Sequence, residues 1–499
     1  MTPPTIRGGS PRVRYQGDSR LEEDFFAACT SLRRFAMPIV TGFAVLSIIS
    51  ASYVGLNGNH VWRQSDSYSQ ILGMLGQPGL GPLDMFHGGR AMFDFPIYQA
   101  IVAVLAAITD GEPLLIVRIL GAVLFVIFVF AGAQTAQMIQ PGAGLVLATL
   151  LATSPLYLHY FATPLPDLLC LTCSAVALVL LISSGNGARY WLALSLIVVS
   201  TLIKAPVPFV FLAFYVTWTL VNWRPALSGR RSWIRFSGLL IASLGAAIVA
   251  ELLRFDINPK LSLRWEFYFG LPTDRISPAT WQTARDYASE AFAFSWLATA
   301  AVMALVLYLV LTRSEGFRLL LPLVVGFASG WLVFTKLYVW HDYYGLPTTF
   351  MVLMAVSIAV RGLAVRIAQR VQLLSKAAPV LLVLAVPLMI MYGHKISSYS
   401  VTSEGQAMRF LLRDAQHFVY VSNEDPDDWR PVVGGLTAKP FTLVSQSEFE
   451  RSCVEILHQE RAVVINRLKV EDGPSPCLSI IRESGASFMK GPQYQVLSW

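Results

Sequence analysis

Charged residues are scarce in this chain. They make up 14% of its 499 residues, against 55% hydrophobic residues, whereas an average soluble domain carries about 25% charged residues. Several apolar runs approach the roughly 20 residues that cross a lipid bilayer. The composition therefore excludes an ordinary soluble domain and predicts a polytopic membrane protein, with the lipid bilayer as its first partner.

Several nucleotide and hydrolase motifs are absent. There is no Walker A motif, no GxGxxG opening a helix and no GxSxG elbow, so nucleotide-driven transport and serine hydrolysis lose their main sequence supports. No internal repeat is evident, although a transporter built from two related halves would show one. The net charge of +7 comes mostly from basic residues between apolar runs, as cytoplasmic loops require. It needs no nucleic acid to explain it.

Cysteines are also few, with five in the chain. Cys170 and Cys173 form a CxxC inside an apolar run, but no second pair stands at metal-ligand spacing. We therefore interpret them as small hydrophobic residues. Cys453 and Cys477 lie in the polar C-terminal segment. If that segment is outside the cytoplasm, they either form a disulfide or remain free.

The charge pattern divides the chain into three regions. Residues 1–36 are rich in arginine and predict a cytoplasmic, partly disordered leader. Residues 37–393 hold the apolar runs, which predict an all-α bundle of about 11–13 transmembrane helices, with an outer loop at 57–94. In residues 394–499 short apolar runs alternate with polar turns, which predicts a small α/β domain. The basic residues place the N-terminus in the cytoplasm and this last domain in the periplasm.

One question of topology stays open upstream of residue 222. If all three apolar runs between residues 95 and 160 cross the membrane, Asp167 falls inside. Either one of these runs is broken or re-entrant, with Gln134–Gly144 and Pro155 as candidate breaks, or Lys204–Ala205–Pro206 does not separate two spans. We favour the broken run, which places Asp167 and Lys204 outside.

The first long polar interval, Asn57–Gln99, concentrates residues that could do chemistry at the mouth of the bundle. Its ionisable, aromatic and amide side chains include Trp62, Arg63, Gln64, Asp66, Tyr68, Asp84, His87, Arg90, Asp94 and Tyr98. Asp66 follows the first span closely, and a carboxylate there could accept a proton from an incoming hydroxyl. The alternative is a helix cap or an ion pair with Arg63.

Two further ionisable residues border apolar runs, where charge is costly and usually has a use. Asp167 follows Thr163-Pro164-Leu165-Pro166, and it is either part of a site or an ordinary helix N-cap. Lys204 stands between two runs beside a proline. It could bind a phosphate, or its chain could extend to the membrane interface.

Polar residues also gather at the outer ends of later runs. His341-Asp342-Tyr343-Tyr344 could hydrogen-bond a phosphate, orient a sugar or bind a divalent metal, although the spacing matches no strong metal-ligand pattern. The alternative is an interfacial belt of aromatic residues. Arg264 precedes Trp265-Glu266-Phe267-Tyr268-Phe269 and could either stack on a sugar or lie along the interface.

Five stretches in order resemble the GT-C glycosyltransferases. The stretches are WRQSD (62–66), DFPIYQ (94–99), SPLYLHYFATPLPD (154–167), LIKAP (202–206) and HDYYGLP (341–347). Within that superfamily the chain is similar to the polyprenyl-phosphate-sugar-dependent, family 39 type group, which includes protein mannosyltransferases and bacterial lipid A aminoarabinose transferases. The resemblance covers about residues 37–393 and leaves out the C-terminal domain.

The resemblance implies roles for particular residues. Asp66 matches the family's first-loop aspartate, the general base. Asp167 matches a second acidic position that orients donor or acceptor, and Lys204 and Tyr344 match positions near the donor phosphate. The other residues of these stretches that we expect to contact substrate are Trp62, Arg63, Gln64, Asp94, His341, Asp342 and Tyr343.

The chain departs from the aminoarabinose branch at one motif. That branch often has an acidic-Lys-Pro triplet where this chain has Asp94-Phe95-Pro96, so the lysine is absent. Arg90, Arg264 or Lys336 would then supply the missing positive charge at the donor phosphate.

The resemblance implies an inverting transfer of a sugar from a polyprenyl-phosphate donor to an envelope glycan or lipid, at the periplasmic face of a bacterial inner membrane. The phosphate is already a good leaving group, so neither a covalent intermediate nor a metal is obligatory, and the lipid-linked sugar is the co-substrate. Two rival interpretations remain: a non-catalytic scaffold of polysaccharide assembly, and a lipid or glycan transporter.

Overall fold

A computed structural model describes most of a helical bundle and part of the C-terminal region. The described residues are 38, 41–42, 44–49, 61–76, 95–183, 187–222, 230–257, 269–292, 294–368, 418–421, 441–444, 446–451, 462–466, 477, 487–490 and 494–498. For Trp62 and Asp66 only the backbone is described.

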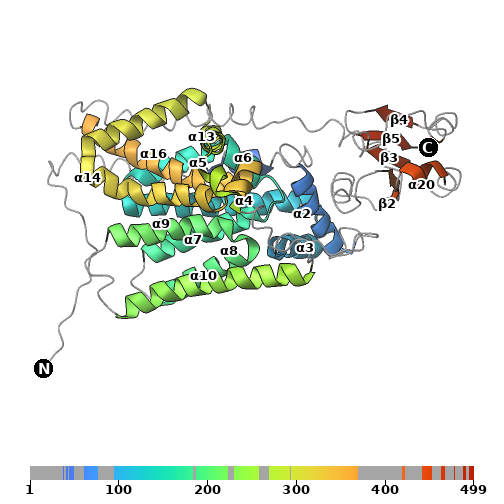
Figure 1. The fold of residues 1–499 in the computed structure, drawn as a ribbon, viewed down its shortest axis with the longest axis horizontal. Coiled ribbons are helices and arrows are strands. Elements are labelled where there is room, and N and C mark those ends of the chain that lie inside the picture. The colour runs from blue at the N-terminus through green and yellow to red at the C-terminus, as the bar shows by residue number, and fades with distance from the viewer. Residues whose placement is uncertain are drawn as a thin grey trace.

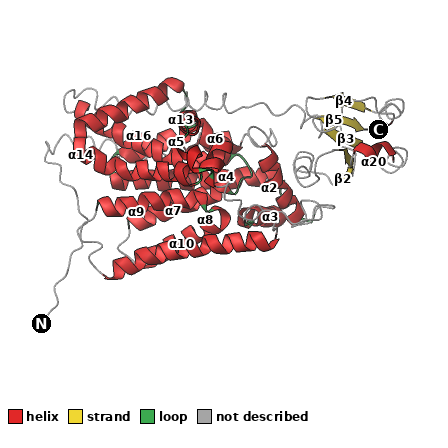
Figure 2. Ribbon diagram, viewed as in Figure 1, coloured by secondary structure: helices red, strands yellow, loops and turns green. Residues whose placement is uncertain are grey.

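Helices form all the regular elements that the structure describes up to residue 368 (Figures 1 and 2). In chain order they are α2 (Val61–Met74), α3 (Ile97–Thr109), α4 (Pro113–Ile139), α5 (Ala143–Thr153), α6 (Pro155–Phe161), α7 (Asp167–Ile182), α8 (Gly187–Lys204), α9 (Pro206–Val221), α10 (Arg230–Ile257), α12 (Pro272–Ile276), α13 (Pro278–Glu290), α14 (Ser295–Val333), α15 (Thr335–Trp340), the 3-10 turn η4 (Asp342–Tyr344) and α16 (Gly345–Ala368). A helix satisfies its own backbone groups, which an apolar surrounding requires.

Six helices among the described residues are long and apolar enough to cross a membrane, and the bent pair α5–α6 makes up to 7. The shorter apolar helices α3, α7 and α9 accompany them. The prediction of an all-α polytopic membrane bundle is confirmed. The expected total of spans stays a prediction, because residues 37–60 lie largely, and residues 369–393 wholly, outside the described residues.

The apolar run at 142–160 is broken. Helix α5 ends at Thr153, α6 begins at Pro155, and the two are bent by 64°. Proline cannot donate the backbone hydrogen bond that would continue the first helix. The end of α6 also lies directly against α4, since a Cβ at Gly121 would overlap the carbonyl oxygen of Phe161. The favoured prediction of a broken run is confirmed, and the break lies at Pro155, one of the two candidate positions.

Helices α7 and α8 pack side by side in opposite directions. Their contact is made by small polar residues: the Ser200 hydroxyl donates to the Cys170 carbonyl at 2.9 Å, and the Ser174 and Ser200 hydroxyls are 2.7 Å apart. Small residues let membrane helices approach closely, and their hydroxyls bond across the contact. The start of α7 and the end of α8 therefore lie at the same end of the bundle.

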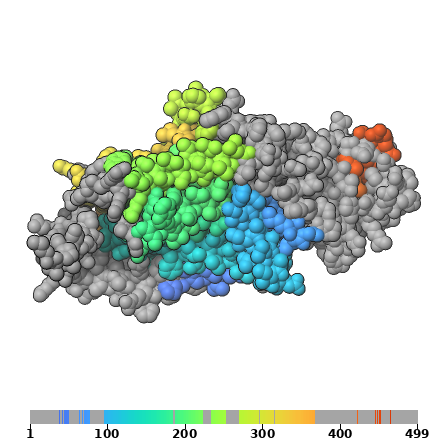
Figure 3. All heavy atoms as spheres, turned by 90° about the horizontal axis from the view of Figure 1, so that it is seen from below, coloured from blue at the N-terminus to red at the C-terminus, as the bar shows by residue number. Residues whose placement is uncertain are grey.

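The outer surface of the bundle is apolar on several helices. Helix α14 bends back at Arg313 (φ 47°, ψ −119°), which divides it into two candidate spans. Only 17% of the residues are buried in the apolar part of α10, within Trp233–Leu252, and only 11% in the first arm of α14, Trp296–Arg313. Figure 3 shows the lime-coloured residues of α10 at the surface of one face. These helices present their apolar side chains outward, as lipid-facing helices do.

The segments between the long apolar helices also contain helices. Helix α2 lies within the expected outer loop 57–94, and α12 and α13 lie between α10 and α14. The sequence description of 57–94 as a loop is therefore incomplete: Val61–Met74 is helical. The leader 1–36 and the boundary at 393–394 lie outside the described residues, so the domain limits stay predictions.

The C-terminal region contains a five-stranded sheet with the order β2-β1-β3-β5-β4. Its strands are β1 (Phe418–Val421), β2 (Phe441–Val444), β3 (Ala462–Asn466), β4 (Ser487–Lys490) and β5 (Tyr494–Ser498), and helix α20 spans Gln446–Arg451. Strands β2, β1 and β3 are parallel, while β5 pairs antiparallel with β3 and β4. This mixed sheet agrees with the predicted small α/β domain.

A disulfide belongs to the same region. Cys477 is disulfide-bonded, and its partner lies outside the described residues. Pairing with Cys453 stays a prediction.

Candidate functional site

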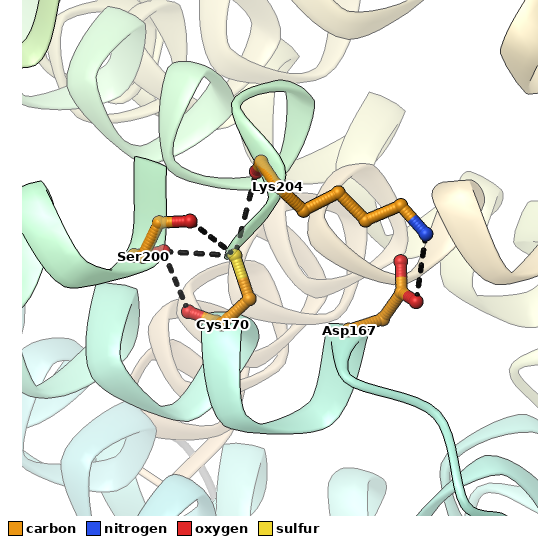
Figure 4. A network of polar contacts seen from close by, with 4 residues as sticks. All are labelled: Asp167, Cys170, Ser200 and Lys204. Atoms are coloured by element: carbon orange, nitrogen blue, oxygen red, sulfur yellow. Dashed lines mark hydrogen bonds and ion pairs between the residues drawn. The ribbon is translucent and has the colours of Figure 1, made fainter. Parts of the chain in front are cut away.

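The candidate site centres on a buried ion pair where the start of α7 meets the end of α8. The Lys204 Nζ atom lies 2.9 Å from Asp167 Oδ2 (Figure 4). The side chains are only 4% and 1% exposed. Removing two charges from water costs several kcal/mol per ion and is offset only by close pairing. Ionisable residues kept inside a membrane bundle usually serve a function.

The packing of α7 on α8 sets the position of this pair. The Cys170 thiol donates to the Ser200 carbonyl at 3.1 Å and lies 3.4 Å from the Lys204 carbonyl oxygen. Figure 4 shows the Lys204 side chain extending from the end of α8 to the carboxylate of Asp167. The hairpin thus brings together two residues that are 37 positions apart in sequence.

Two tyrosine rings enclose the lysine. The Nζ atom of Lys204 lies 4.9 Å from the ring centroid of Tyr343 and 4.5 Å from that of Tyr344. Both rings belong to η4, and His341 stacks on Tyr343 with centroids 5.3 Å apart. A cation over an aromatic face is stabilised by the ring quadrupole. We call Lys204, Asp167, Tyr343 and Tyr344 the Lys204 cluster.

A carboxylate and a tyrosine adjoin this cluster. Asp342 is 5% exposed and accepts a hydrogen bond from the Tyr160 hydroxyl, at the end of α6. Tyr160 was not predicted as a site residue, although it lies in the quoted stretch 154–167. Glu290, the last residue of α13, faces the same carboxylate. Partial burial, and then the nearby charges of Asp342 and Asp286, raise the pKa of Glu290 above its usual value.

Helix α2 reaches the cluster through Arg63. This arginine is 3% exposed and interacts electrostatically with Tyr343. Gln64 beside it is fully buried. The helix therefore carries the backbone of Asp66 toward the same region, three residues beyond Arg63.

No protein-family model and no curated protein matches the chain. Solved structures do match its shape. ArnT from Cupriavidus metallidurans bound to undecaprenyl phosphate superimposes with a TM-score of 0.58 and 10% identity, over 92% of this chain and 97% of that one. Oligosaccharyltransferase AglB from Archaeoglobus fulgidus, in complex with an inhibitory peptide and a dolichol-phosphate, superimposes with a TM-score of 0.51 and 11% identity. This match covers 87% of this chain and 70% of that one.

The chain therefore shares the fold of these two structures. The resemblance drawn from the five sequence stretches is thus confirmed at the level of the fold. At 10–11% identity the likeness extends to the path of the chain and not to individual side chains.

Within this bundle the predicted site residues separate into groups. The side chains that the structure brings into one region are Arg63, Asp167, Lys204, His341, Asp342, Tyr343 and Tyr344. Gln64, which follows Arg63 on α2, is buried as well. The residues outside the described part are Arg90, Asp94 and Arg264, together with the side chains of Trp62 and Asp66. Among the described residues no group of three or more His, Cys, Asp or Glu is arranged to hold a metal.

Sequence reasoning missed a second buried cation of the bundle. Arg118, in the second turn of α4, is 1% exposed and interacts electrostatically with Tyr98, Glu112 and Tyr68. The Tyr68 hydroxyl donates to Glu112 Oε1 at 3.3 Å, which ties α2 to the start of α4. An arginine inside the apolar run 112–135 was the signal available in the sequence.

Proposed function

We propose that this chain is an inverting glycosyltransferase. It moves a sugar from a polyprenyl-phosphate donor to an envelope glycan or lipid at the periplasmic face of a bacterial inner membrane. The observation that carries the proposal is the buried Lys204, paired with Asp167 and enclosed by Tyr343 and Tyr344. The fold supports the lipid-linked donor, because a protein of the same fold binds undecaprenyl phosphate.

Lys204 provides the main positive charge for the donor phosphate. An ammonium group in a site of low dielectric stabilises the charge that develops on a leaving phosphate. Tyr344, beneath the lysine, and Arg63, on α2, line the same space. Arg90 and Arg264 are further cations that we assign to this phosphate.

Asp167 orients the sugar. Its Oδ2 atom pairs with Lys204, while Oδ1 is buried and has no hydrogen-bond partner among the described residues. A carboxylate oxygen without a donor is well suited to a sugar hydroxyl, because charged acceptors form strong hydrogen bonds. We assign Trp62, Gln64, Asp94 and the residues His341 and Asp342 to the surrounding substrate contacts.

Asp66 acts as the general base. The oxygen of the acceptor hydroxyl forms a bond to the anomeric carbon, and the bond from that carbon to the phosphate oxygen breaks, its electron pair leaving with the phosphate. The hydroxyl proton passes to the Asp66 carboxylate. Attack from the face opposite the phosphate inverts the anomeric centre, and no covalent enzyme intermediate is required.

Donor binding tests the Lys204 assignment. Purified full-length protein is titrated with undecaprenyl phosphate, comparing wild type, Lys204→Met, Lys204→Arg and Arg285→Gln. We expect Lys204→Met to lose at least about tenfold in affinity, which is about 1.4 kcal/mol, and Lys204→Arg to retain part of it. Arg285→Gln removes an exposed cation and should bind normally. Equal binding by all four proteins would overturn the assignment.

Transfer tests the assignment of the base. Reconstituted protein is offered a panel of polyprenyl-phosphate sugars and extracted envelope lipids and glycans. Asp66→Asn keeps the size of the side chain but cannot take the proton, so turnover should fall by roughly two to four orders of magnitude while donor binding is retained. Transfer by the variant at the wild-type rate would remove Asp66 as the base. No transfer by wild type would favour a scaffold.

A further inference from the structure

A second set of buried polar groups lies where α2, α3 and α4 pack on one another. The hydroxyls of Ser67 and Tyr98 and the carboxamide oxygens of Gln70 and Gln99 have no hydrogen-bond partner among the described residues. All four residues are at most 2% exposed. We call these four residues, together with Arg118, the α2–α4 seam.

The seam is unusual because four of its side-chain groups have no hydrogen-bond partner in the part of the chain that the structure describes. A buried polar group without a hydrogen bond costs about 1–3 kcal/mol, and the large majority of such groups in folded proteins are satisfied. Four such groups lie on the two packed helices α2 and α3. We infer that a bound polar molecule forms the missing hydrogen bonds. Neither the Lys204 cluster nor the proposed transfer of the proton uses these groups.

The types of group indicate what that partner is. Carboxamide oxygens only accept hydrogen bonds, hydroxyls both donate and accept, and a guanidinium only donates. The positive charge of Arg118 faces the carboxylate of Glu112, so the seam carries little net charge. Carboxamide oxygens would repel an anion, whereas each could accept a hydrogen bond from a sugar hydroxyl. The rings of Tyr68 and Tyr98 supply aromatic surface beside these groups.

The seam continues from the Lys204 cluster along one face of α2. Arg63, Ser67 and Gln70 stand at i, i+4 and i+7, which places them on the same side of the helix. At 1.5 Å per residue, Ser67 lies about 6 Å and Gln70 about 10 Å beyond Arg63 along the axis. Arg63 interacts with Tyr343, so a saccharide attached near the phosphate could extend toward the seam.

We propose that the α2–α4 seam is a carbohydrate-binding subsite that takes the hydroxyl groups of a saccharide. The saccharide is either the sugar of the donor or the terminal sugar of the acceptor, since both offer the same chemistry. The choice of a saccharide as the ligand rests on the proposed function. The four groups without a hydrogen-bond partner among the described residues are an observation that does not depend on it. Tyr98, Gln99, Ser67 and Gln70 hydrogen-bond its hydroxyls.

The test measures binding of simple sugars to full-length protein in detergent. Thermal unfolding is followed at rising concentrations of the methyl glycosides of glucose, mannose, galactose and arabinose. The seam variants are Tyr98→Phe and Gln99→Leu. The control is Thr135→Val, which also removes a buried hydroxyl that has no hydrogen-bond partner in the described part of the chain. Thr135 lies about 25 Å from Arg118 along the axis of α4.

We expect at least one glycoside to raise the unfolding temperature of wild type and of Thr135→Val in a saturable way. The two seam variants should need at least about tenfold more of that glycoside. Without sugar they should be as stable as wild type or more stable, because each loses an unsatisfied polar group. No shift with any glycoside, or equal shifts in the seam variants and wild type, would overturn the proposal.

A second arm separates this inference from the proposed function. Undecaprenyl phosphate is titrated into the same proteins, and its affinity should depend on Lys204 and not on Tyr98. If wild type binds undecaprenyl phosphate through Lys204 but its response to glycosides does not depend on Tyr98, the seam alone is refuted. If the response to a glycoside depends on Tyr98 but lipid affinity does not depend on Lys204, the donor assignment alone is refuted. Competition between the glycoside and an undecaprenyl-phosphate-linked sugar assigns the seam to the donor sugar, and additive binding assigns it to the acceptor.

Discussion

Two buried cations in this bundle have opposite kinds of surroundings. Lys204 lies 2.9 Å from Asp167, whose side chain is 1% exposed. Arg118 is equally buried, but Glu112, a carboxylate that acts on it electrostatically, is exposed and also accepts from the backbone N–H of Leu115 at 2.6 Å. Lys204 therefore has a partner that is removed from water with it, and Arg118 shares a partner that stays in water.

The difference shows that one part of the bundle has its buried charges paired, while another part keeps buried polar groups without hydrogen bonds among the described residues. A buried ion pair is held tightly, because separating it leaves an uncompensated charge. In the proposed function an incoming phosphate shares Lys204 with this carboxylate. Glu112 offsets the charge of Arg118, while the Tyr98 hydroxyl and the Gln99 carboxamide oxygen have no hydrogen-bond partner among the described residues. That region calls for hydroxyl groups and not for an anion.

The largest expected effect comes from removing one half of the buried pair. Asp167→Asn leaves the Lys204 charge without a carboxylate and should cost about 3–5 kcal/mol of unfolding free energy. The double variant Asp167→Asn/Lys204→Met removes both charges and should recover much of this loss. Breaking the surface pair Arg285–Asp286, which is 69% and 50% exposed, should cost less than about 1 kcal/mol.

Unfolding in detergent measures these differences. Additive losses in the double variant would mean that the two charges do not stabilise each other. A comparable loss on Glu112→Gln would erase the contrast between the two cations, because an exposed carboxylate should contribute little.

The next effect joins the two regions. Gly121 lies one turn after Arg118, and its backbone contacts α6, which carries Tyr160. Gly121→Ala would place a Cβ against the Phe161 carbonyl oxygen, so α4 and α6 must separate. We expect a loss of about 1–3 kcal/mol, with weaker binding of undecaprenyl phosphate.

A matched glycine gives the control for this prediction. A Cβ at Gly245 in α10 meets nothing within 4 Å. Gly245→Ala should be neutral or stabilise by about 0.5–1 kcal/mol. Equal effects of the two substitutions would show that the close approach of α4 to α6 does not position the Lys204 cluster.

Part of this architecture could be predicted from single positions. Asp167 and Lys204 drew attention because charge beside an apolar run is costly. Pro155 indicated the break between α5 and α6 because proline cannot continue a helix. The C-terminal α/β domain was predicted from short apolar runs between polar turns, and one such run, Phe418–Val421, forms strand β1.

The rest depends on contacts between distant segments. The pairing of Lys204 with Asp167 follows from the way Cys170 and Ser200 bring α7 and α8 together. The sequence near either residue does not predict this pairing, because the two residues are 37 positions apart. Arg118 was missed because the apolar run around it dominates the average hydropathy. Helix α2 was assigned to a loop because its buried face is polar, with Arg63 and Gln64 among its residues.

A smaller effect tests the link between α7 and α8. Ser200→Ala removes the hydroxyl that donates to the Cys170 carbonyl at 2.9 Å. Hydrogen bonds between membrane helices contribute about 0.6 kcal/mol on average, so we expect a loss of about 0.5–1.5 kcal/mol and a modest loss of lipid affinity. Ser195→Ala, on the same helix, removes a hydroxyl that bonds only within α8 at 3.0 Å and should change neither. The same response to both variants would contradict a role for Ser200 in placing Lys204.

The smallest effect concerns a carboxylate that faces like charge instead of a cation. Burial and Asp342 raise the pKa of Glu290 in the folded protein. The folded state then binds this proton more tightly than the unfolded state. Glu290 therefore has no electrostatic effect on folding at low pH, where it is protonated in both states, and it opposes folding as the pH rises past its usual pKa. Glu290→Gln should therefore be slightly more stable than wild type at neutral pH, with the difference vanishing at acidic pH. Glu315→Gln, an exposed carboxylate of α14, is the control. A stability difference that is constant with pH would mean that Glu290 acts through packing and not through its charge.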